Sequence, residues 1–337
     1  MSTIIYPPSI PWNWMFQRPQ HILFLLSTLG YKVLYEDVGK FHPPTAQDLS
    51  PDFTLCQGVP ALSIPHPRPR ILWLTVPNHI SIVSKYKPDL IVFDAVDVPK
   101  NELASWAHYY PETIKRSHLI FASAHSIYKR LSKEHSNVHF IPNGVEYKHF
   151  SKHMERPKDL PNSPNLIGYV GAIAPWVDWE LLDYVVKEHP DITFIFIGTL
   201  LKMSRFPLTQ KNVLYLGYKQ YSQLPAYLQN IKVGLIPFRL TEMTKGCNPI
   251  KLYEYYATGL PVLATHLPEL HSVPLINLAR SPQEFSSILK KLLKETDLEQ
   301  KKRKEFAKRN NWHIRACEID KQIRSLVPPE VCRDNNL

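Results

Sequence analysis

The sequence predicts an α/β protein built of two doubly wound domains that face each other across a cleft. Three observations support this prediction. The chain has 337 residues, which exceeds one ordinary hydrophobic core. Short apolar, β-rich runs alternate with helical patterns, as expected for parallel sheets with crossover helices. The alternation stops at a polar, proline-rich stretch near residues 146–164 and then begins again.

Residues 1–150 are expected to form the first domain. Helical patterns such as residues 18–30 and 125–135 separate its predicted strands. These strands are, in order, TIIYP, YKVLYED, ILWLTV, DLIVFDAV, HLIFASA and VHFIPNG.

Residues 160–315 are expected to form the second domain, followed by a C-terminal helix or tail over residues 316–337. Its predicted strands are LIGYVG, ITFIFIG, NVLYLGY, VGLIPF, PVLAT and LINLAR. Ligands of open α/β sheets bind beyond the carboxyl ends of the strands, so we expect a site between the two domains.

Composition favours a globular protein of a reducing cytoplasm. Hydrophobic residues make up 44% of the chain and charged residues 21%. The four cysteines form no Cys-x-x-Cys pair, which argues against a disulfide framework or a zinc site. The N-terminus has no basic leader, and no apolar run approaches the roughly 20 residues of a spanning helix. We therefore expect neither export by a signal peptide nor insertion in a membrane.

Positive charge gathers in residues 290–309, which hold nine basic and four acidic residues within a chain of net charge +10. Such a segment most often forms a solvated helix face, and the alternatives are contact with an anionic membrane or with nucleic acid. We keep peripheral membrane contact as the functional expectation and expect no nucleic-acid partner.

The stretch CNPIKLYEYYATGLPVLAT, residues 247–265, predicts a helix, a turn at Gly259 and a buried strand opened by Pro261. Lys251 and Glu254 lie three positions apart near the start of this helix, where free N–H groups favour an anion. The pattern fits a ligand with phosphate and hydroxyl groups. A solvated ion pair is the alternative.

Four motifs from residue 141 onward resemble those of the retaining GT-B glycosyltransferases of family 4. They are IPNGVEYKHF, GYVGAIAPWVDWELL, NVLYLGYKQYSQLPAYL and NPIKLYEYYATGLPVLAT, in the family's order and spacing. The N-terminal FQRPQHI resembles a bacterial subgroup that includes teichuronic-acid-type biosynthetic transferases. The resemblance covers nearly the whole chain. It implies two Rossmann-like domains and transfer of a sugar from a nucleoside-diphosphate donor to a hydroxyl acceptor, with retention of configuration.

The resemblance also implies roles in donor binding. Glu254 would bind the ribose hydroxyls, while Lys251 and the N–H groups after Asn248 would face the diphosphate. Pro249 suits the first helical turn because it has no N–H. We expect a UDP-sugar as the donor substrate and no separate cofactor. No Asp-x-Asp sequence occurs, so we expect no metal.

Other donor contacts are expected from Gly171, Tyr218, Lys219 and Arg239. Gly171 would let the backbone approach the phosphates, although it could be an ordinary strand-end glycine. Tyr218 and Lys219 would hold the base, although Tyr218 could be part of the core. Arg239 would neutralise phosphate charge.

Two departures from the family pattern bear on activity. Family members usually carry a second glutamate eight positions before the ribose-binding one, where this chain has Gly246. The usual Arg and Lys after the first strand of the second domain are replaced by Ala172 and Val177. These changes mark either a subgroup or a weakened enzyme. The cations left for the phosphates are Lys251, Lys245, Arg239 and Arg18.

The first domain is expected to hold the acceptor, a glycan or a lipid-linked molecule. The segment WNWMFQRPQH contributes Trp12, Gln17, Arg18 and His21, because aromatic faces stack on sugars and polar groups read hydroxyls. The tryptophans could instead cover a helix end. Asp94 and Asp97 follow a strand, and either could orient the acceptor hydroxyl as a catalytic residue. Asp97 could also be a helix N-cap.

Two other functions stay open on the sequence. One is a nucleotide-sugar epimerase of the GT-B fold, which would act without an acceptor. The other is a non-catalytic binding or scaffold protein, which is plausible because Gly246 stands where the family usually has a glutamate. A dinucleotide oxidoreductase is not expected, because no Gly-x-Gly-x-x-Gly occurs.

Overall fold

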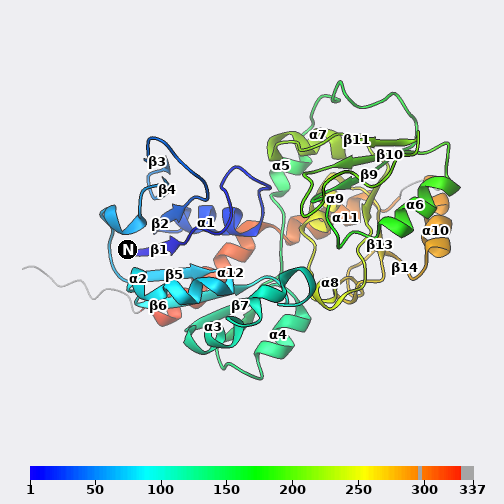
Figure 1. Ribbon diagram of the computed structural model, residues 1–337. Coiled ribbons are helices and arrows are strands. Elements are labelled where there is room, and N and C mark those ends of the chain that lie inside the picture. The colour runs from blue at the N-terminus through cyan, green and yellow to red at the C-terminus, as the bar shows by residue number, and fades with distance from the viewer. Residues whose placement is uncertain (295–297, 328–337) are drawn as a thin grey trace, which may run out of the picture.

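The computed structural model describes residues 1–294 and 298–327. Within these ranges the chain forms two sheets, one of eight strands and one of six. They lie side by side, each with its own helices (Figure 1). The predicted α/β class with two parallel-sheet units is confirmed.

The first sheet has the strand order β3-β4-β2-β1-β5-β6-β7-β8, and the described pairs are parallel except β3 with β4. Its strands are β1 (Ser2–Tyr6), β2 (Tyr31–Glu36), β3 (Thr45–Ser50), β4 (Phe53–Gln57), β5 (Arg70–Leu74), β6 (Leu90–Ala95), β7 (Leu119–Ala122) and β8 (Val138–Phe140). Its α-helices are α1 (Arg18–Thr28), α2 (Val83–Tyr86), α3 (Tyr110–Arg116) and α4 (His125–Leu131), and its short 3-10 helices are η1 (Ala61–Ser63), η2 (Pro77–Ile82) and η3 (Asn101–Trp106).

The hairpin of β3 and β4 was not predicted. The side chains of β3 are mostly exposed, so this edge strand shows no apolar alternation. Its partner β4 is buried but only five residues long.

The second sheet has the order β11-β10-β9-β12-β13-β14, with parallel pairing throughout its described ladders. The strands are β9 (Leu166–Val170), β10 (Thr193–Ile197), β11 (Val213–Tyr215), β12 (Val233–Ile236), β13 (Val262–Thr265) and β14 (Asn277–Ala279). Each corresponds to a predicted run. The helices after the first sheet are α5 (Tyr147–Ser151), α6 (Trp179–Glu188), α7 (Leu224–Leu228), α8 (Glu242–Lys245), α9 (Ile250–Thr258), α10 (Pro282–Lys294), α11 (Gln300–Arg309) and α12 (Trp312–Leu326), with η4 (Tyr221–Gln223) and η5 (Pro268–Leu270).

The apolar runs form strands because both faces of each sheet are covered. In β1, Ile4 and Tyr6 belong to one hydrophobic cluster and Ile5 to another, on the opposite face. Alternate side chains of one strand therefore fill two cores. A third cluster fills the second unit and includes Phe194, Phe196 and Tyr255.

The chain crosses between the two sheets twice. The first crossing follows β8, and the second lies between α11 and α12. At the crossings the Val145 N–H donates to Asn310 O at 3.0 Å and the Trp312 N–H to Val145 O at 3.1 Å. Helix α12 then packs with the first sheet, where Trp312 and Ile319 join its core (Figure 1).

The domain boundaries at residues 150, 160 and 315 stay predictions. The return of α12 to the first core was not foreseen, because the packing partners of a helix far along the chain leave no local pattern. Residues 328–337 of the predicted tail lie outside the described residues.

The basic segment 290–309 spans α10, α11 and residues 295–297, which lie outside the described residues. One face of α11 packs on α9: Arg303 Nε donates to Gly259 O, and the Phe306 ring contacts Tyr253 and Tyr256. The exposed basic residues of the segment are Lys290, Lys291, Lys294, Lys301, Lys302, Lys308 and Arg309. Among the helices described here, none combines the length and apolarity needed to cross a membrane.

Candidate active site

A cavity of about 480 Å³ lies where the carboxyl ends of the two sheets meet. Each sheet lines it with residues that lie within four positions of the end of a strand. From the first sheet these are Ser9 and Ile10 after β1, Thr75 and Val76 after β5, and Val96 and Asp97 after β6. From the second they are Gly171 after β9, Gly198 after β10 and Phe238 after β12. The cavity thus occupies the place where open α/β sheets bind ligands.

Lys251 and Glu254 of α9 both line this cavity. Glu254 is 8% exposed, and burial raises the pKa of its carboxyl to about 7. Burial also lowers the pKa of Lys251, whose Nζ lies 4.5 Å from the Phe238 ring centroid and 5.2 Å from that of Tyr169. Within the described residues neither side chain forms a hydrogen bond or ion pair. The pair is therefore not a solvated surface pair.

Two glycines make room for Lys251 at the ends of β9 and β10. A Cβ atom at Gly171, whose φ is +149°, would lie 2.9 Å from Lys251 Cε. A Cβ atom at Gly198 would lie 1.8 Å from Gly171 O. Any larger residue at either position would displace the lysine or separate the two loops. Gly171 therefore shapes the floor of the cavity.

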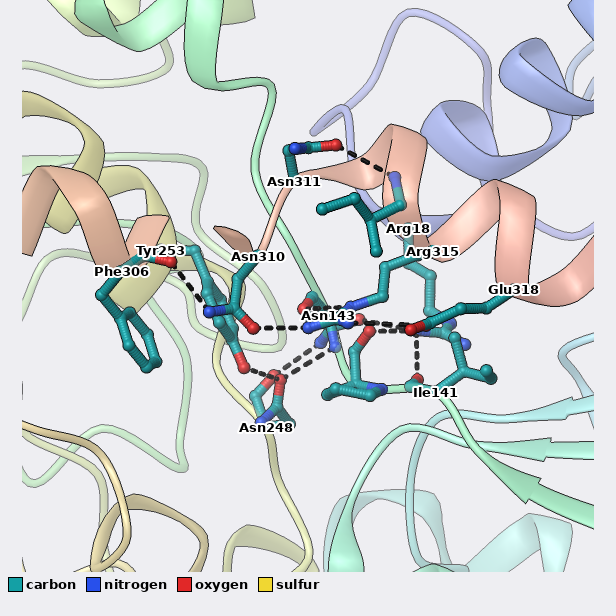
Figure 2. Close-up of polar contacts among 12 residues, drawn as sticks. Arg18, Ile141, Asn143, Asn248, Tyr253, Phe306, Asn310, Asn311, Arg315 and Glu318 are labelled. Carbon is teal, nitrogen blue, oxygen red and sulfur yellow. Dashed lines mark hydrogen bonds and ion pairs between the residues drawn. The ribbon is translucent and has the colours of Figure 1, made fainter. Parts of the chain in front are cut away.

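Asn248 and Pro249 hold the entry to α9. Pro249 is the N-cap residue, one position earlier than expected, and gives no side-chain cap. Asn248 is 8% exposed and is bound by Asn143, which follows β8. The Asn143 N–H donates to Asn248 Oδ1 at 3.1 Å, and Asn143 Nδ2 donates to Asn248 O at 2.6 Å (Figure 2). The side chain of Asn248 thus has a structural partner as well as a place in the cavity wall.

The segment after β11 forms another part of the wall. Tyr218 is 41% exposed, and its hydroxyl donates to Asn13 O in the first unit at 3.2 Å. It is therefore not a core residue. Lys219 Nζ donates to the Asp159 carboxylate at 2.7 Å, which raises the pKa of Lys219. Both residues line the cavity, but the Lys219 ammonium already has a carboxylate partner.

Gly246 contacts the first unit directly. A Cβ atom at this position would lie 2.6 Å from Val98 Cγ2, so a side chain there would require Val98 to shift or the two units to separate. Nearby, Asp97 lines the cavity, and burial raises the pKa of its carboxyl to about 7. Its carboxyl has no hydrogen-bond partner in the part of the chain that is described. The N-cap alternative is not observed, because Lys100 precedes η3.

Arg18 and Asp94 form a buried ion pair. Arg18 Nε lies 2.9 Å from both Asp94 carboxylate oxygens, and Arg18 Nη2 lies 2.8 Å from Oδ1. Arg18 Nη1 donates to Ile141 O at 2.9 Å. Asp94 is fully buried and lies outside the cavity lining, whereas Arg18 borders the cavity. This corrects the expectation that Asp94 orients an acceptor, since its carboxylate is already neutralised.

Trp12 and His21 of the N-terminal segment pack against other rings and not into the cavity. The Trp12 ring packs on Phe16, Tyr35 and Phe53, so it covers the first core. The His21 ring stacks on Trp312 at 5.1 Å, and burial lowers its pKa to about 3. Both lie outside the cavity lining, and only Gln17 and Arg18 of the four predicted acceptor residues reach it.

Arg239 and Lys245 also lie outside the cavity lining. Each is exposed and paired with a carboxylate: Arg239 with Glu180 at 3.4 Å, Lys245 with Glu242 at 2.7 Å. Of the four cations considered for phosphate, Lys251 is the one that lines the cavity without a carboxylate partner among the described residues.

An apolar wall of the cavity was not predicted. It consists of Val76, Val96, Leu103, Trp106, Trp176, Phe238 and Met243. Leu103 and Trp106 come from η3, are half-buried, and belong to none of the three hydrophobic clusters of the described residues. Their signal in the sequence is slight, namely two apolar residues three positions apart in a short polar segment.

The sequence of this chain is similar to those of known glycosyltransferases. A family model described as "Glycosyl transferases group 1" matches residues 164–295. The putative teichuronic acid biosynthesis glycosyltransferase TuaH of Bacillus subtilis (strain 168) is 26% identical over 224 residues, covering 58% of this chain and 55% of its own length. The chain thus spans about half the length of that curated relative.

Solved structures with the same fold cover nearly the whole chain. Sucrose-phosphate synthase from Thermosynechococcus elongatus has a TM-score of 0.76 at 14% identity, covering 97% of this chain and 99% of that one. Anabaena HepE in complex with UDP and glucose has a TM-score of 0.65 at 13% identity, covering 96% and 100%. A structure described as trehalose-6-phosphate from E. coli bound with UDP-2-fluoro glucose has a TM-score of 0.70 at 11% identity, covering 96% of this chain and 99% of that one. The chain therefore has the GT-B fold, and its residues 164–295 are similar to the group 1 glycosyl transferases.

Proposed function

We propose that this protein is a retaining glycosyltransferase that moves a sugar from a UDP-sugar to a hydroxyl acceptor. One observation carries the proposal: the buried Glu254 and the half-buried Lys251 line a cavity at the strand ends, and neither has a hydrogen-bond or ion-pair partner among the described residues. A buried charge without a partner costs stability, so such groups mark the place where a ligand supplies the partner.

The donor is proposed to bind along α9. The Glu254 carboxylate accepts hydrogen bonds from the vicinal hydroxyls of ribose. Lys251 and the N-terminal end of α9 face the diphosphate, whose charge they stabilise as the glycosidic bond breaks. UDP is proposed as the carrier because two proteins of the same fold were solved with UDP and glucose and with UDP-2-fluoro glucose.

The acceptor is proposed to bind at the first-unit wall of the cavity. Asp97 orients its hydroxyl, since this carboxyl lines the cavity and has no other partner among the described residues. With its pKa raised to about 7, Asp97 exchanges protons readily at neutral pH. It replaces Asp94 in this role. The reaction is proposed to need no metal, because the sequence contains no Asp-x-Asp motif.

The apolar wall supports an acceptor that carries an apolar group, such as a lipid-linked glycan, over a free sugar. Leu103 and Trp106 of η3 belong to this wall together with Met243 of α8. The Met243 N–H donates to Asn101 Oδ1 at 3.2 Å, which holds the two sides together. Burying an apolar chain there would contribute about 25 cal/mol per Å².

The test is a screen of nucleotide-sugars for thermal stabilisation, followed by assays of UDP release with and without acceptor. Acceptors should be offered in pairs, as the free glycan and as the same glycan with an alkyl chain. We expect acceptor-dependent release that is faster with the alkyl form. Trp106→Ala should remove the preference for the alkyl form and leave UDP affinity unchanged.

The same assays separate the alternatives. Epimerised nucleotide-sugar or free UDP without any acceptor would identify an epimerase or hydrolase. Nucleotide binding without turnover on any acceptor would identify a binding protein. For the donor site, Glu254→Ala should weaken UDP-sugar binding by about 1–3 kcal/mol, because the ribose hydroxyls lose their buried partner. Unchanged affinity in a folded variant would remove Glu254 from the site.

A peripheral membrane contact on the cytoplasmic side is proposed for the exposed basic residues of α10 and α11. Vesicles containing anionic lipid should bind the protein, and binding should fade above about 0.15 M salt because charges are screened over roughly 8 Å. Equal binding to neutral vesicles, or none to either, would contradict this contact.

A further inference from the structure

A buried polar junction connects the first unit to the start of α9. Its centre is Asn143, which is 7% exposed and lies in the first chain crossing. Figure 2 shows Asn143 between Asn248, just before α9, and the side chain of Arg315 from α12. Arg18 of α1 and Tyr253 of α9 complete the junction.

On the first-unit side, Asn143 is fixed by Arg18. Arg18 Nη1 donates to Asn143 Oδ1 at 3.2 Å and to the carbonyls of Ile141 and Pro142 at 2.9 Å and 3.3 Å. The Asp94 carboxylate holds the same guanidinium. The segment from β8 to Asn143 is therefore bound to the first unit.

On the second-unit side, Asn143 makes two hydrogen bonds to one residue. Its N–H donates to Asn248 Oδ1 at 3.1 Å and its Nδ2 to Asn248 O at 2.6 Å. The Tyr253 hydroxyl donates to the same Asn248 Oδ1 at 3.2 Å. Because the N-cap residue Pro249 provides no side-chain cap, these bonds anchor the start of α9.

The second crossing closes the junction from the other side. A Cβ atom at Gly144 would lie 2.8 Å from Asn310 O, so the two crossings touch at the backbone. Arg315 Nε donates to Asn143 O at 3.5 Å, and its Nη2 donates to Asn310 Oδ1 at 2.5 Å. A rotation of one unit relative to the other must therefore change the bonds of Asn143 to Arg18 or to Asn248.

We propose that Asn143 is a positioning residue that sets the first turn of α9, and with it Lys251 and Glu254, relative to the first-unit wall of the cavity. The part of this inference that concerns the donor rests on the proposed function. Lys251 lies three positions after Asn248 and Glu254 six, so a tilt of the first turn moves both groups. Donor binding and the relative orientation of the units are then coupled reciprocally through one residue.

Asn143→Asp separates the two sides of the junction. The aspartate keeps an oxygen that accepts from Arg18, but it replaces the Nδ2 donor with an oxygen facing Asn248 O, which was 2.6 Å away. The two oxygens repel each other, so the start of α9 loses one of its two bonds to Asn143, while the backbone N–H bond to Asn248 Oδ1 and the contact with Arg18 remain.

Asn310→Asp is the matched control. Asn310 also accepts from an arginine, Arg315, and its Nδ2 donates to a backbone carbonyl, Phe306 O, at 2.8 Å. The same substitution therefore breaks the same kind of bond in the second crossing, but at α11 instead of α9. A general loss of stability should affect both variants, whereas a loss of positioning should affect only Asn143→Asp.

The first measurement is hydrogen exchange without ligand, over residues 250–255 in the intact chain. We expect amide exchange about tenfold faster in Asn143→Asp, as for loss of a buried hydrogen bond, and near the unsubstituted rate in Asn310→Asp. Unchanged exchange in Asn143→Asp would overturn the inference. Asn143→Ala, which removes the side-chain bonds without adding charge, gives the same comparison if Asn143→Asp does not fold.

The second measurement is titration with UDP and steady-state kinetics. We expect UDP to bind Asn143→Asp about tenfold more weakly and the donor KM to rise, with the acceptor KM unchanged. Equal losses in Asn310→Asp would overturn the role in positioning. If the unsubstituted protein binds no UDP, the proposed donor fails, while faster exchange confined to Asn143→Asp would still support the anchoring of α9.

Discussion

The two walls of the cavity use similar residues in opposite ways. On the second unit, Glu254 is buried and Lys251 is half-buried, and neither forms a hydrogen bond or ion pair with the described residues. On the first unit, Arg18 and Asp94 are buried more deeply but neutralise each other through contacts of 2.8–2.9 Å. Unpaired buried charge is costly, whereas paired charge is the ordinary way to build a junction. The difference indicates that Lys251 and Glu254, and not Arg18 and Asp94, are available to bind a ligand.

Tryptophans of the first unit show the same contrast. Trp12 fills a gap among the core rings of Tyr35 and Phe53. Trp106 packs with no hydrophobic cluster of the described residues and faces the cavity instead. Residue type alone does not separate binding groups from structural ones, but the presence of a partner does.

The largest expected effect follows from breaking the buried pair. Asp94→Ala leaves the Arg18 guanidinium buried without its carboxylate, so the free energy of unfolding should fall by about 3–5 kcal/mol. Chemical denaturation at pH 7 measures it. The double variant Arg18→Met, Asp94→Leu should recover much of the loss because it leaves no unpaired charge. A loss below about 1 kcal/mol for Asp94→Ala would place this pair among exposed ones.

Glu254→Gln tests the second-unit wall through the dependence of the free energy of unfolding on pH. Burial raises the pKa of Glu254 from its ordinary 4.5 to about 7, so between these values the folded protein holds a proton that the unfolded chain has lost. The unsubstituted protein therefore loses stability as pH rises from 4.5 through 7, and the loss persists above 7. Glutamine does not ionise. At pH 8 the variant should be more stable by roughly 1–3 kcal/mol, since one pKa unit corresponds to about 1.4 kcal/mol.

Denaturation of both proteins at pH 5 and at pH 8 gives the measurement. The difference between them should shrink toward the acid end. UDP affinity of the variant should fall at the same time, because the amide accepts from the ribose hydroxyls less strongly than a carboxylate. A difference in stability independent of pH would mean that the Glu254 carboxyl has a partner in the folded protein.

Gly246→Ala tests how closely the two walls approach. The new Cβ atom would lie 2.6 Å from Val98 Cγ2, so either Val98 shifts or the units separate. We expect a loss of about 1–3 kcal/mol in the free energy of unfolding, typical of overpacking. Solution scattering should show a larger radius of gyration if the units separate. Val98→Ala in the same chain should restore both values, and failure to do so would locate the strain elsewhere.

The fold could be predicted further than the site. The apolar runs of the second unit all became strands, because parallel strands buried on both faces leave a continuous local pattern. The exposed edge strand β3 leaves none. Lys251 and Glu254 could be found because both lie on one short helix whose start is visible in the sequence. The pairing of Arg18 with Asp94 spans 76 positions and has no local signal.

The smallest expected effect concerns Arg239, which the sequence suggested for phosphate. Its side chain is 45% exposed, lies outside the cavity lining and pairs with Glu180, itself 91% exposed, at 3.4 Å. Exposed pairs contribute about 0–1 kcal/mol because water and salt screen them. Arg239→Ala should change the free energy of unfolding by less than about 0.5 kcal/mol and leave UDP affinity within about twofold at 0.15 M salt.

Repeating the UDP titration at low salt distinguishes a distant charge from a direct contact. A distant cation attracts the diphosphate over about 10 Å or more when salt is dilute, so a small loss for Arg239→Ala should appear there and vanish at 0.15 M salt. Lys245→Ala, an equally exposed and paired cation, should behave alike. A tenfold loss that persists at 0.15 M salt for Arg239→Ala alone would show that Arg239 leaves Glu180 to contact the diphosphate. Lys251 would then share with Arg239 the neutralisation that we assign to it, because the donor would draw an exposed side chain into the cavity.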